Sequence, residues 1–303
     1  MLSVIIPTYN PNISRLNQTL QGLRSQTLSI QDWELIIIDN NSTNNFEATI
    51  DLSWHLDAKV IREPQQGLTL ARIKGFNTAK HDIFIMVDDD NILHPQYLER
   101  ALYILKKDQK LGAIGGKSIP LFEAKEPSYL KQFYGCLALR DLGEEVIIDE
   151  WNNSYPDFAP IGAGMAIRKS ALKSYIQKIE NGNNMISDRK GTSLSSGGDN
   201  DIVLEILKNG SSVGYFPQLS LKHIIPINRT SIAYLSKLNF ESSISWVKLL
   251  NSHNILPWKS ISKKTLFLRY IKSYIKNRAW LNSSNYIKWR GSCGIFKALS
   301  EIN

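Results

Sequence analysis

The chain has 303 residues, of which 43% are hydrophobic and 10% aromatic, as in a globular protein with a large core. Two cysteines exclude a disulfide framework, no apolar run reaches the roughly 18 residues of a membrane span, and the N-terminus lacks the features of a signal peptide, so a cytoplasmic location is expected. The net charge of +8 is uneven, because residues 226–303 carry thirteen Lys/Arg and two Glu, which leaves residues 1–225 slightly acidic.

The first 120 residues alternate between apolar, β-branched runs and amphipathic segments. The runs predict buried strands at 2–10, 33–40, 58–63, 82–89 and 111–119, and the amphipathic segments predict helices at 12–26, 68–79 and 95–107. This alternation predicts an α/β fold with a parallel sheet that helices cover on both faces.

Polar residues follow three of these strands, at Pro7–Tyr9, Asp39–Asn41 and Asp88–Asp90. In open α/β sheets, ligands bind at the carboxyl ends of the strands. The convergence of three polar segments at this edge therefore predicts a binding site.

Asp88, Asp89 and Asp90 place three carboxylates together at the end of a buried strand. A divalent cation that also holds a diphosphate would neutralise them, since Mg²⁺ is bound by one or two carboxylates and substrate phosphates. Alternatively, Asp90 or Asn91 could cap the next helix in a solvated turn.

Two other nucleotide sites lack their motifs. "LGAIGGKS" ends like a phosphate-binding loop, but Leu111 occupies the position of its first glycine. The first strand is followed by "PTYNPN" and not by G-x-G-x-x-G, so hydride transfer with a dinucleotide has no support.

Beyond residue 120, residues 162–172 predict a short strand entering a helix. Residues 181–198 are rich in Gly, Ser and Asn and predict a long loop, and residues 199–210 predict a helix that ends at Gly210.

Six segments together resemble the family 2 glycosyltransferases: "VIIPTYN", "LIIIDNNSTN", "QQGLTLARIKGFNTA", "IMVDDDNIL", "IGAGMAIRKSAL" and "GGDNDIVLEILKNG". The resemblance covers about residues 2–225 and implies a GT-A domain over 1–225, with a Rossmann-like, mostly parallel sheet and flanking helices. Its donor half would lie over about 1–120 and its acceptor half over about 121–225. It also implies a nucleotide-diphospho-sugar donor, with UDP favoured by family frequency, Mn²⁺ or Mg²⁺ as cofactor, and inversion at the anomeric carbon.

The resemblance assigns roles in donor binding. Pro7, Thr8 and Tyr9 would line the base pocket, and Asp39 would accept a hydrogen bond from the base. Asp88 would lie near the ribose or sugar, and Asp90 would bind the metal. The remaining expected donor-site residues are Asn41, Gly67, Arg72 and Asp89. Many relatives have Asp-Asp-Gly-Ser where this chain has Asp39-Asn40-Asn41-Ser42, which leaves the identity of the base open.

The family's Glu-Asp motif aligns with Gly198 and Asp199, so Asp199 would be the base that deprotonates the acceptor hydroxyl. The dipole of the helix would favour its ionised form. Alternatively, Asp199 is only a helix cap.

The resemblance suggests further contacts in the second half. His223 precedes an Ile-Pro segment, as a metal ligand does in many relatives, or it is a core histidine. Arg189 and Lys190 could close over the diphosphate, or belong to a solvated loop. Gly162, Gly164 and Met165 match the usual acceptor wall, or serve strand packing alone.

Residues 226–303 form a basic helical extension outside the resemblance, with helices predicted at 230–251 and 263–281. In the second helix, Phe267, Tyr270, Ile271, Tyr274 and Ile275 form one stripe, and most basic residues lie off it. This pattern fits a helix on an anionic membrane, such as the inner face of the plasma membrane, or a helix packed on the catalytic domain. We expect no nucleic-acid binding, because no recognition fold accompanies the charge.

These observations predict a metal-dependent inverting glycosyltransferase that acts on a glycan or lipid-linked glycan in surface polysaccharide biosynthesis. The alternatives are a catalytically silent sugar-nucleotide-binding or membrane scaffold protein and a nucleotidyltransferase.

Overall fold

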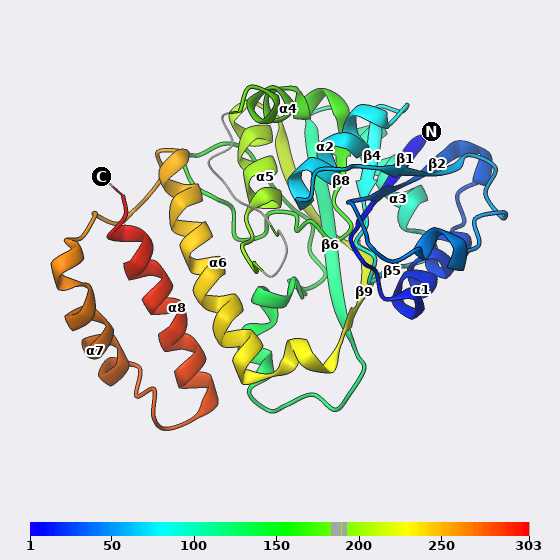
Figure 1. Ribbon diagram of the computed structural model, residues 1–303. Coiled ribbons are helices and arrows are strands. Elements are labelled where there is room, and N and C mark those ends of the chain that lie inside the picture. The colour runs from blue at the N-terminus through cyan, green and yellow to red at the C-terminus, as the bar shows by residue number, and fades with distance from the viewer. Residues whose placement is uncertain (183–188, 190–192, 303) are drawn as a thin grey trace. The chain divides into compact units, whose positions relative to one another are not determined.

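The computed structural model describes residues 1–182, 189 and 193–302. The chain forms two compact units (Figure 1). The first contains residues 1–121, 138–183 and 202–224, and the second contains residues 122–137, 184–201 and 225–303. Two internal segments belong with the C-terminal residues in this division, and the predicted domain boundary after residue 225 stays a prediction.

In the described residues, nine strands form one mixed sheet in the order β3-β2-β1-β4-β8-β6-β9-β5, with β7 paired to β9. The strands are β1 Leu2–Thr8, β2 Trp33–Asp39, β3 Ala58–Arg62, β4 Ile83–Met86, β5 Asn91–Leu93, β6 Leu111–Phe122, β7 Ile147–Asp149, β8 Ala166–Arg168 and β9 Ser212–Ile225.

The parallel arrangement predicted for the N-terminal half is confirmed for β1 to β4, which pair in parallel. Strand β8 runs antiparallel to both β4 and β6, so the sheet is mostly but not entirely parallel, as the GT-A fold implies. Strand β8 comes from the second half of the chain and inserts beside β4, so periodicity in the first 120 residues carried no information about it.

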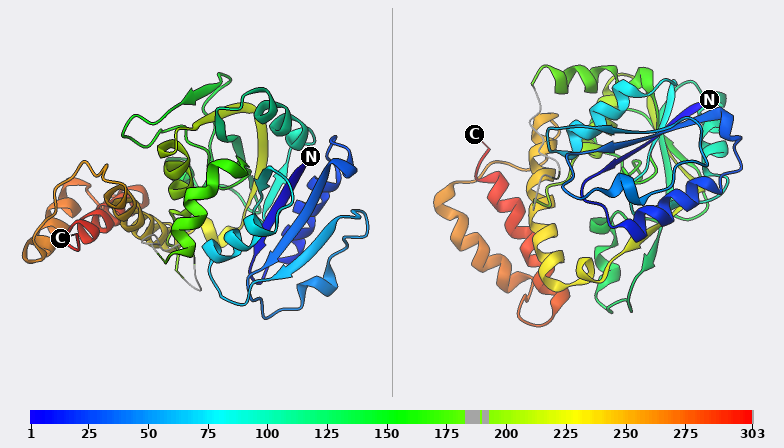
Figure 2. Two further views of the ribbon diagram at one scale, coloured as in Figure 1. Left: turned by 90° about the horizontal axis from the view of Figure 1, so that it is seen from above. Right: turned by 45° about the vertical axis from the view of Figure 1, so that its right-hand side comes forward.

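Helices cover both faces of the sheet (Figure 2). One core cluster joins Val4, Ile6 and Ile37 to helices α1 (Ile13–Arg24) and α3 (Tyr97–Lys107). The other joins Ile5, Ile38 and Phe84 to α2 (Leu68–Thr78), α4 (Lys173–Glu180) and α5 (Gly198–Lys208). Alternate residues of β1 point to opposite faces, which explains why its apolar run is continuous.

Helix α3 begins at Tyr97, two residues after the predicted start at Pro95. Residues 94–97 form a turn in which the Tyr97 amide donates to the His94 carbonyl at 2.8 Å. The Pro95 carbonyl accepts a hydrogen bond from the Thr27 amide, so Pro95 contacts the chain just after the end of α1 and is not part of α3.

The second unit is helical, with α6 (Ile232–Ser252), α7 (Leu266–Lys276), α8 (Ser283–Leu299) and the 3₁₀ segment η3 (Leu130–Leu137). Helix α8 packs along α6 on one side and α7 on the other (Figure 1).

The long helix predicted at 263–281 was wrong, because α7 ends at Lys276 and Arg278 adopts a φ of +48°. Helix α8 was not predicted, since Gly291 and Gly294 weaken its pattern, yet these glycines allow close approach to α6. None of the helices in the described residues is long and apolar enough to cross a bilayer.

Candidate functional site

The three polar segments predicted to meet do so at the carboxyl edge of the parallel strands. Strand β1 lies between β2 and β4, and Thr8 stands opposite Asp39 in the register with β2. The Thr8 hydroxyl donates to a carboxylate oxygen of Asp89, which joins the end of β1 to the aspartate segment. The topology therefore brings residues 7–9, 39–41 and 88–90 together, within the first unit.

The aspartate segment is a tight turn between β4 and β5. The fully buried Asn91 closes this turn through two hydrogen bonds with Asp88. The Asn91 side-chain oxygen accepts from the backbone amide of Asp88 at 3.3 Å, and the backbone amide of Asn91 donates to the Asp88 carbonyl at 3.1 Å. Asp88 and Asp89 are half-buried, whereas Asp90 is 6% exposed. The turn thus presents the three carboxylates at different depths, and neither Asp90 nor Asn91 caps α3, which begins six residues later.

His223 faces Asp90 from the paired strand. Strands β5 and β9 place Asn91 opposite His223, and the Ile224 amide donates to the Asp90 carbonyl at 2.9 Å. The His223 Nε2 atom lies 3.4 Å from Asp90 Oδ1, and both side chains are buried.

This pair fits a divalent cation. Two ligands that each lie about 2.1 Å from a metal and at right angles to one another are roughly 3 Å apart, close to the observed separation. A carboxylate oxygen and an imidazole nitrogen are both atoms that bind divalent metals in proteins.

The loop after β2 holds Asp39 in a defined orientation. The Ser42 amide donates to Asp39 Oδ1 at 2.8 Å, and Asp39 is 4% exposed. Asn41 adopts a φ of +63° and its side-chain oxygen accepts from Arg62 at 2.8 Å. Tyr9, at the end of the neighbouring strand, is 44% exposed. The loop therefore places a fixed carboxylate near an exposed aromatic ring, a combination suited to a nucleobase.

Asn40 joins this loop to the start of α2, a role that sequence reasoning did not assign. Its side-chain amide donates to the Gln65 carbonyl at 2.8 Å, and its oxygen accepts from the Gly67 amide at 2.7 Å. Gly67 has a φ of +152° and precedes α2, which carries the buried Arg72. The polar run Asp39–Ser42 could have indicated this role. A buried asparagine side chain, such as that of Asn40, needs hydrogen-bond partners on the backbone.

The segment predicted as an acceptor wall packs against β4. The Gly164 amide donates to the Met86 carbonyl, and the Gly164 carbonyl accepts from the Tyr97 hydroxyl at 2.6 Å. Gly164 has a φ of +77°, and a Cβ atom there would lie 2.7 Å from the Tyr97 oxygen. Met165 is completely buried. These contacts show how Gly164 and Met165 pack, and the contact of Gly162, Gly164 and Met165 with an acceptor stays a prediction.

The segment that carries Asp199 belongs to the second unit and is attached to α6. The Leu194 amide donates to a carboxylate oxygen of Glu241 at 2.6 Å, and the Ser196 amide donates to the Ser245 hydroxyl at 3.4 Å. Asp199 lies in the first turn of α5 and is half-buried. Helix α6 therefore sets the path of the chain that leads to Asp199.

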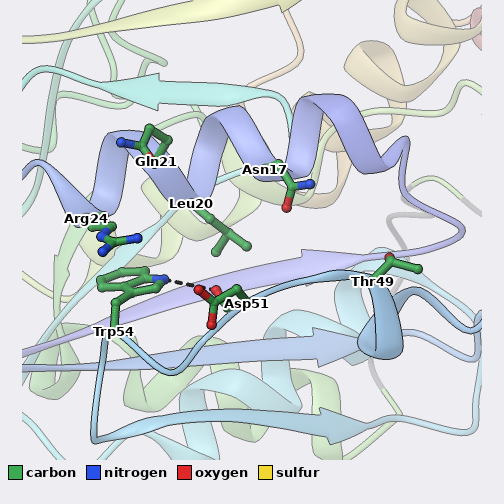
Figure 3. A pocket seen from close by; sticks show the side chains of 7 residues that line it. All are labelled: Asn17, Leu20, Gln21, Arg24, Thr49, Asp51 and Trp54. Carbon is green, nitrogen blue, oxygen red and sulfur yellow. Dashed lines mark hydrogen bonds between the residues drawn. The ribbon is translucent and has the colours of Figure 1, made fainter.

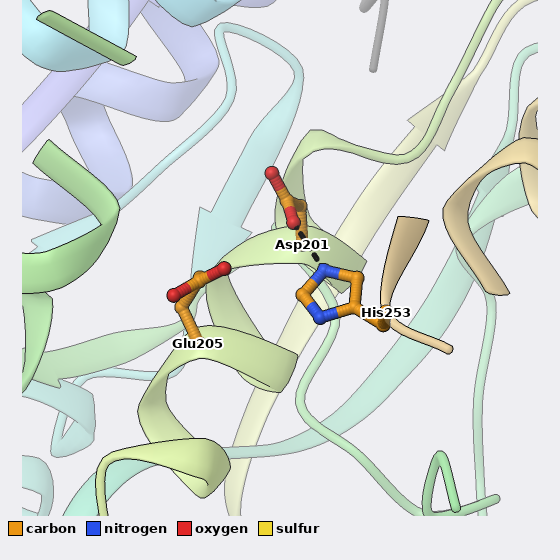
Figure 4. A group of neighbouring side chains, drawn as sticks. All are labelled: Asp201, Glu205 and His253. Atoms are coloured by element: carbon orange, nitrogen blue, oxygen red, sulfur yellow. Dashed lines mark hydrogen bonds and ion pairs between the residues drawn. The ribbon is translucent and has the colours of Figure 1, made fainter. Parts of the chain in front are cut away.

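A third contact follows Asp199. The His253 Nε2 atom lies 2.6 Å from Asp201 Oδ1, and both side chains are buried (Figure 4). Glu205, one turn further along α5, pairs with Lys178 at 3.0 Å.

Arg189 is exposed, and Lys190 lies outside the described residues, so the predicted closure over a diphosphate stays a prediction for both.

A pocket of about 280 Å³ lies between α1 and the loop that follows β2 (Figure 3). Asn17, Arg24, Asp51 and Trp54 are among its lining residues, and the Trp54 indole donates to the Asp51 carbonyl at 3.0 Å. None of the predicted site residues lines it, so it is separate from the edge described above.

Comparison with known families decides the class of the protein. The family model described as "Glycosyl transferase family 2" matches residues 3–175. The chain belongs to this family. It is therefore a glycosyltransferase that uses a nucleotide-sugar donor, and the predicted enzyme class is confirmed.

The relatives of this family 2 glycosyltransferase share limited identity. A glucosyl-dolichyl phosphate glucuronosyltransferase of Haloferax volcanii is 21% identical over 285 residues, which cover 92% of this chain and 82% of the relative. TarP of Staphylococcus aureus, a poly(ribitol-phosphate) beta-N-acetylglucosaminyltransferase, is 31% identical over 52% of this chain and 53% of its own length.

Solved structures support the fold. S. aureus TarS residues 1–349 in complex with UDP-GlcNAc match with a TM-score of 0.57 and 14% identity, covering 99% of this chain and 90% of that one. The predicted GT-A fold with added C-terminal helices is confirmed.

Proposed function

We propose that this glycosyltransferase transfers a hexosyl or N-acetylhexosaminyl group, with inversion, from a UDP-sugar to a hydroxyl of a glycan or lipid-linked glycan in surface polysaccharide biosynthesis. Two relatives support the acceptor class, because their names describe action on glucosyl-dolichyl phosphate and on poly(ribitol-phosphate). TarS binds UDP and UDP-GlcNAc in its crystal structures, which favours UDP. The reaction would occur in the cytoplasm, at the inner face of a membrane when the acceptor is lipid-linked.

The donor would bind at the carboxyl edge of β1, β2 and β4. Tyr9 offers an exposed ring for the base, and Asp39 has a second carboxylate oxygen that can accept a hydrogen bond from it. Asp88 and Asp89 would face the ribose and sugar, and Arg72 would approach the nucleotide from α2.

Asp90 and His223 would hold Mn²⁺ or Mg²⁺. When bound there, the cation would neutralise the charge of the nucleoside diphosphate as it leaves. The observation that carries this proposal is the 3.4 Å separation of two buried ligand atoms beside an aspartate turn at the carboxyl edge of the sheet.

Asp199 would be the general base. Its carboxylate would take the proton of the acceptor hydroxyl while the acceptor oxygen forms a bond to the anomeric carbon and the bond to the diphosphate oxygen breaks. Attack from the face opposite the leaving group gives inversion. Arg189 and Lys190 would approach the leaving diphosphate, and Gly162 would leave room for an acceptor.

The first test is calorimetric titration of UDP, GDP, dTDP and CDP into the full chain, with Mn²⁺ and then with EDTA. We expect UDP to bind at least about 10-fold more tightly than the other three, and only with the metal. Equal binding of all four with EDTA present would contradict a base-selective metal site.

The second test measures turnover in Asp199→Asn. We expect hydrolysis of the donor, with water as acceptor, to fall by at least about 100-fold while UDP binding is unchanged. If wild-type protein binds UDP but neither hydrolyses nor transfers any UDP-sugar, the chain is a silent nucleotide-sugar-binding protein.

A further inference from the structure

Helix α7 exposes an apolar row that its packing in the second unit does not use. Its inner face meets α8, since Tyr274 packs edge-on against Trp289 with ring centroids 5.0 Å apart. The Trp289 indole also donates to the Tyr270 carbonyl at 3.1 Å. The stripe predicted from the sequence is therefore divided, because Tyr270 and Tyr274 are both half-buried while its other members are exposed.

Four of the other apolar residues of this helix are exposed to solvent, whereas Leu266 is half-buried. Phe267 is 72% exposed and Ile275 is 59% exposed, with Ile271 between them at i+4 spacing. Leu268 lies beside this row, and Trp280 and Leu281 continue the exposed apolar surface past the end of the helix. We call these six residues the α7 apolar surface.

A basic row runs beside the α7 apolar surface. Lys264, Leu268, Lys272 and Lys276 follow one another at i+4 spacing, and all three lysines are exposed. No Asp or Glu occurs from residue 242 to residue 300, so no acidic side chain of this stretch offsets the positive charge. An exposed apolar surface bordered by cations has the chemistry of a helix that lies in the headgroup region of an anionic bilayer.

We propose that α7 is the membrane-binding element of this protein, with the α7 apolar surface inserted among acyl chains and Lys264, Lys272 and Lys276 against anionic lipid headgroups. The positive charge of the basic row favours an anionic membrane over a second copy of the chain as the partner of this surface. Two copies facing one another through this surface would bring two basic rows together, which like-charge repulsion disfavours. The proposal goes beyond the transfer reaction and does not depend on it.

The experiment measures cosedimentation of the full chain with vesicles of phosphatidylcholine alone and with about 30% phosphatidylglycerol. We expect binding to the anionic vesicles to be at least about 100-fold tighter, since each basic residue near such a surface contributes about a factor of five. We expect Lys264→Gln/Lys272→Gln/Lys276→Gln to remove this preference. The triple Phe267→Ser/Ile271→Ser/Ile275→Ser should weaken binding at least about 10-fold at physiological salt.

Matched controls separate these effects from net charge and general hydrophobicity. Lys106→Gln/Lys107→Gln/Lys131→Gln makes the same change in net charge at exposed sites outside α7, and Leu56→Ser/Tyr103→Ser removes exposed apolar side chains in the first unit. Both should bind vesicles like wild type. Helical circular dichroism and UDP binding without vesicles show whether each variant is folded.

The proposal is overturned if wild-type protein does not bind anionic vesicles, or if the α7 and control variants lose binding equally. A concentration-dependent dimer in sedimentation velocity that disappears in the apolar triple variant, without vesicle binding by wild type, would show that a second copy covers this surface. Donor binding and hydrolysis in solution test the transfer reaction separately, so either proposal can fail alone.

Discussion

His253, one residue past the end of α6, holds Asp201 in the first turn of α5 through a contact of 2.6 Å between two buried side chains. Asp201 lies two residues from Asp199, and Glu241 and Ser245 of α6 hold the preceding chain. The helical extension is therefore part of the support for the proposed base, although it lies beyond the 3–175 segment that matches the family.

His253→Ala should lower turnover more than donor binding, because it frees the turn that carries Asp199 and leaves the donor edge intact. We expect kcat to fall roughly 10- to 100-fold, as for other groups that orient catalytic ligands, with the Kd for UDP within about twofold of wild type. His253→Gln, which can place a donor near the Nε2 position, should recover part of the rate. Single-turnover kinetics and calorimetry give the two quantities.

His55 provides the matched control, because it is also a buried histidine but precedes β3 at the amino end of the sheet. His55→Ala should lose stability without a selective loss of kcat. Equal losses of kcat in the two variants at matched stability would show that His253 acts only through folding.

Asp90→Asn should weaken the contribution of Mn²⁺ to UDP binding. The amide is a neutral and weaker ligand, so we expect the metal-dependent gain in affinity to fall by roughly 10- to 100-fold, and His223→Ala should do the same. Asp82→Asn is the control, because Asp82 is exposed at the opposite end of β4. Calorimetry with and without EDTA checks this, and an unchanged metal response in both site variants would place the cation elsewhere.

The meeting of the three polar segments at the carboxyl edge of β1, β2 and β4 could be predicted from the sequence, because strand ends are local features. Each apolar run ends in its own polar segment, and a parallel sheet brings such ends together whatever the loops do. Asp90 and His223 are 133 residues apart, and only the antiparallel pairing of β5 with β9 places them in contact. The resemblance to a family suggested His223, whereas periodicity did not.

Other parts of the site depend on contacts that leave no local signal. Asp201 and His253 come from different helices, and neither sequence neighbourhood shows that the two meet. The division of α7 into a packed tyrosine face and an exposed apolar row depends on α8, which its two glycines concealed. Sequence periodicity identified the stripe but could not show which part would be covered.

Asn40→Ala should weaken donor binding and stability together, because it removes the two hydrogen bonds that join the Asp39 loop to the segment before α2. Each of these part-buried hydrogen bonds contributes about 0.5–1.5 kcal/mol, so we expect a loss of about 1–3 kcal/mol in the free energy of unfolding. We expect UDP affinity to fall about 10-fold as Asp39 and Gly67 lose their common support. Asn44→Ala, in the exposed part of the same loop, should change neither quantity. Urea unfolding and calorimetry distinguish this from a purely local effect, which would leave the affinity unchanged.

Glu34 in β2 should make folding sensitive to acid. It is fully buried, which opposes ionisation, but Lys59 at 2.9 Å, the Ser3 hydroxyl at 2.7 Å and the Lys80 amide at 2.7 Å together lower the pKa of its carboxyl below the ordinary value of 4.5. A carboxyl with a lowered pKa in the folded state stabilises the protein above its unfolded pKa, and this contribution is lost as the pH falls through the folded pKa.

Glu34→Gln should therefore lose about 3 kcal/mol of unfolding free energy at pH 7, since it breaks a buried charge pair. The difference from wild type should persist down to about pH 5 and shrink as the pH falls below 4.5, because Glu34 of the unfolded chain then becomes protonated. It should disappear as the pH falls through the lower pKa of the folded state. Urea unfolding at pH 7, 5, 4 and 3 measures it, and Glu47→Gln, an exposed substitution of the same kind, should match wild type at each pH. A difference as large at pH 3 as at pH 7 would show that the contribution of Glu34 comes from packing and not from its charge.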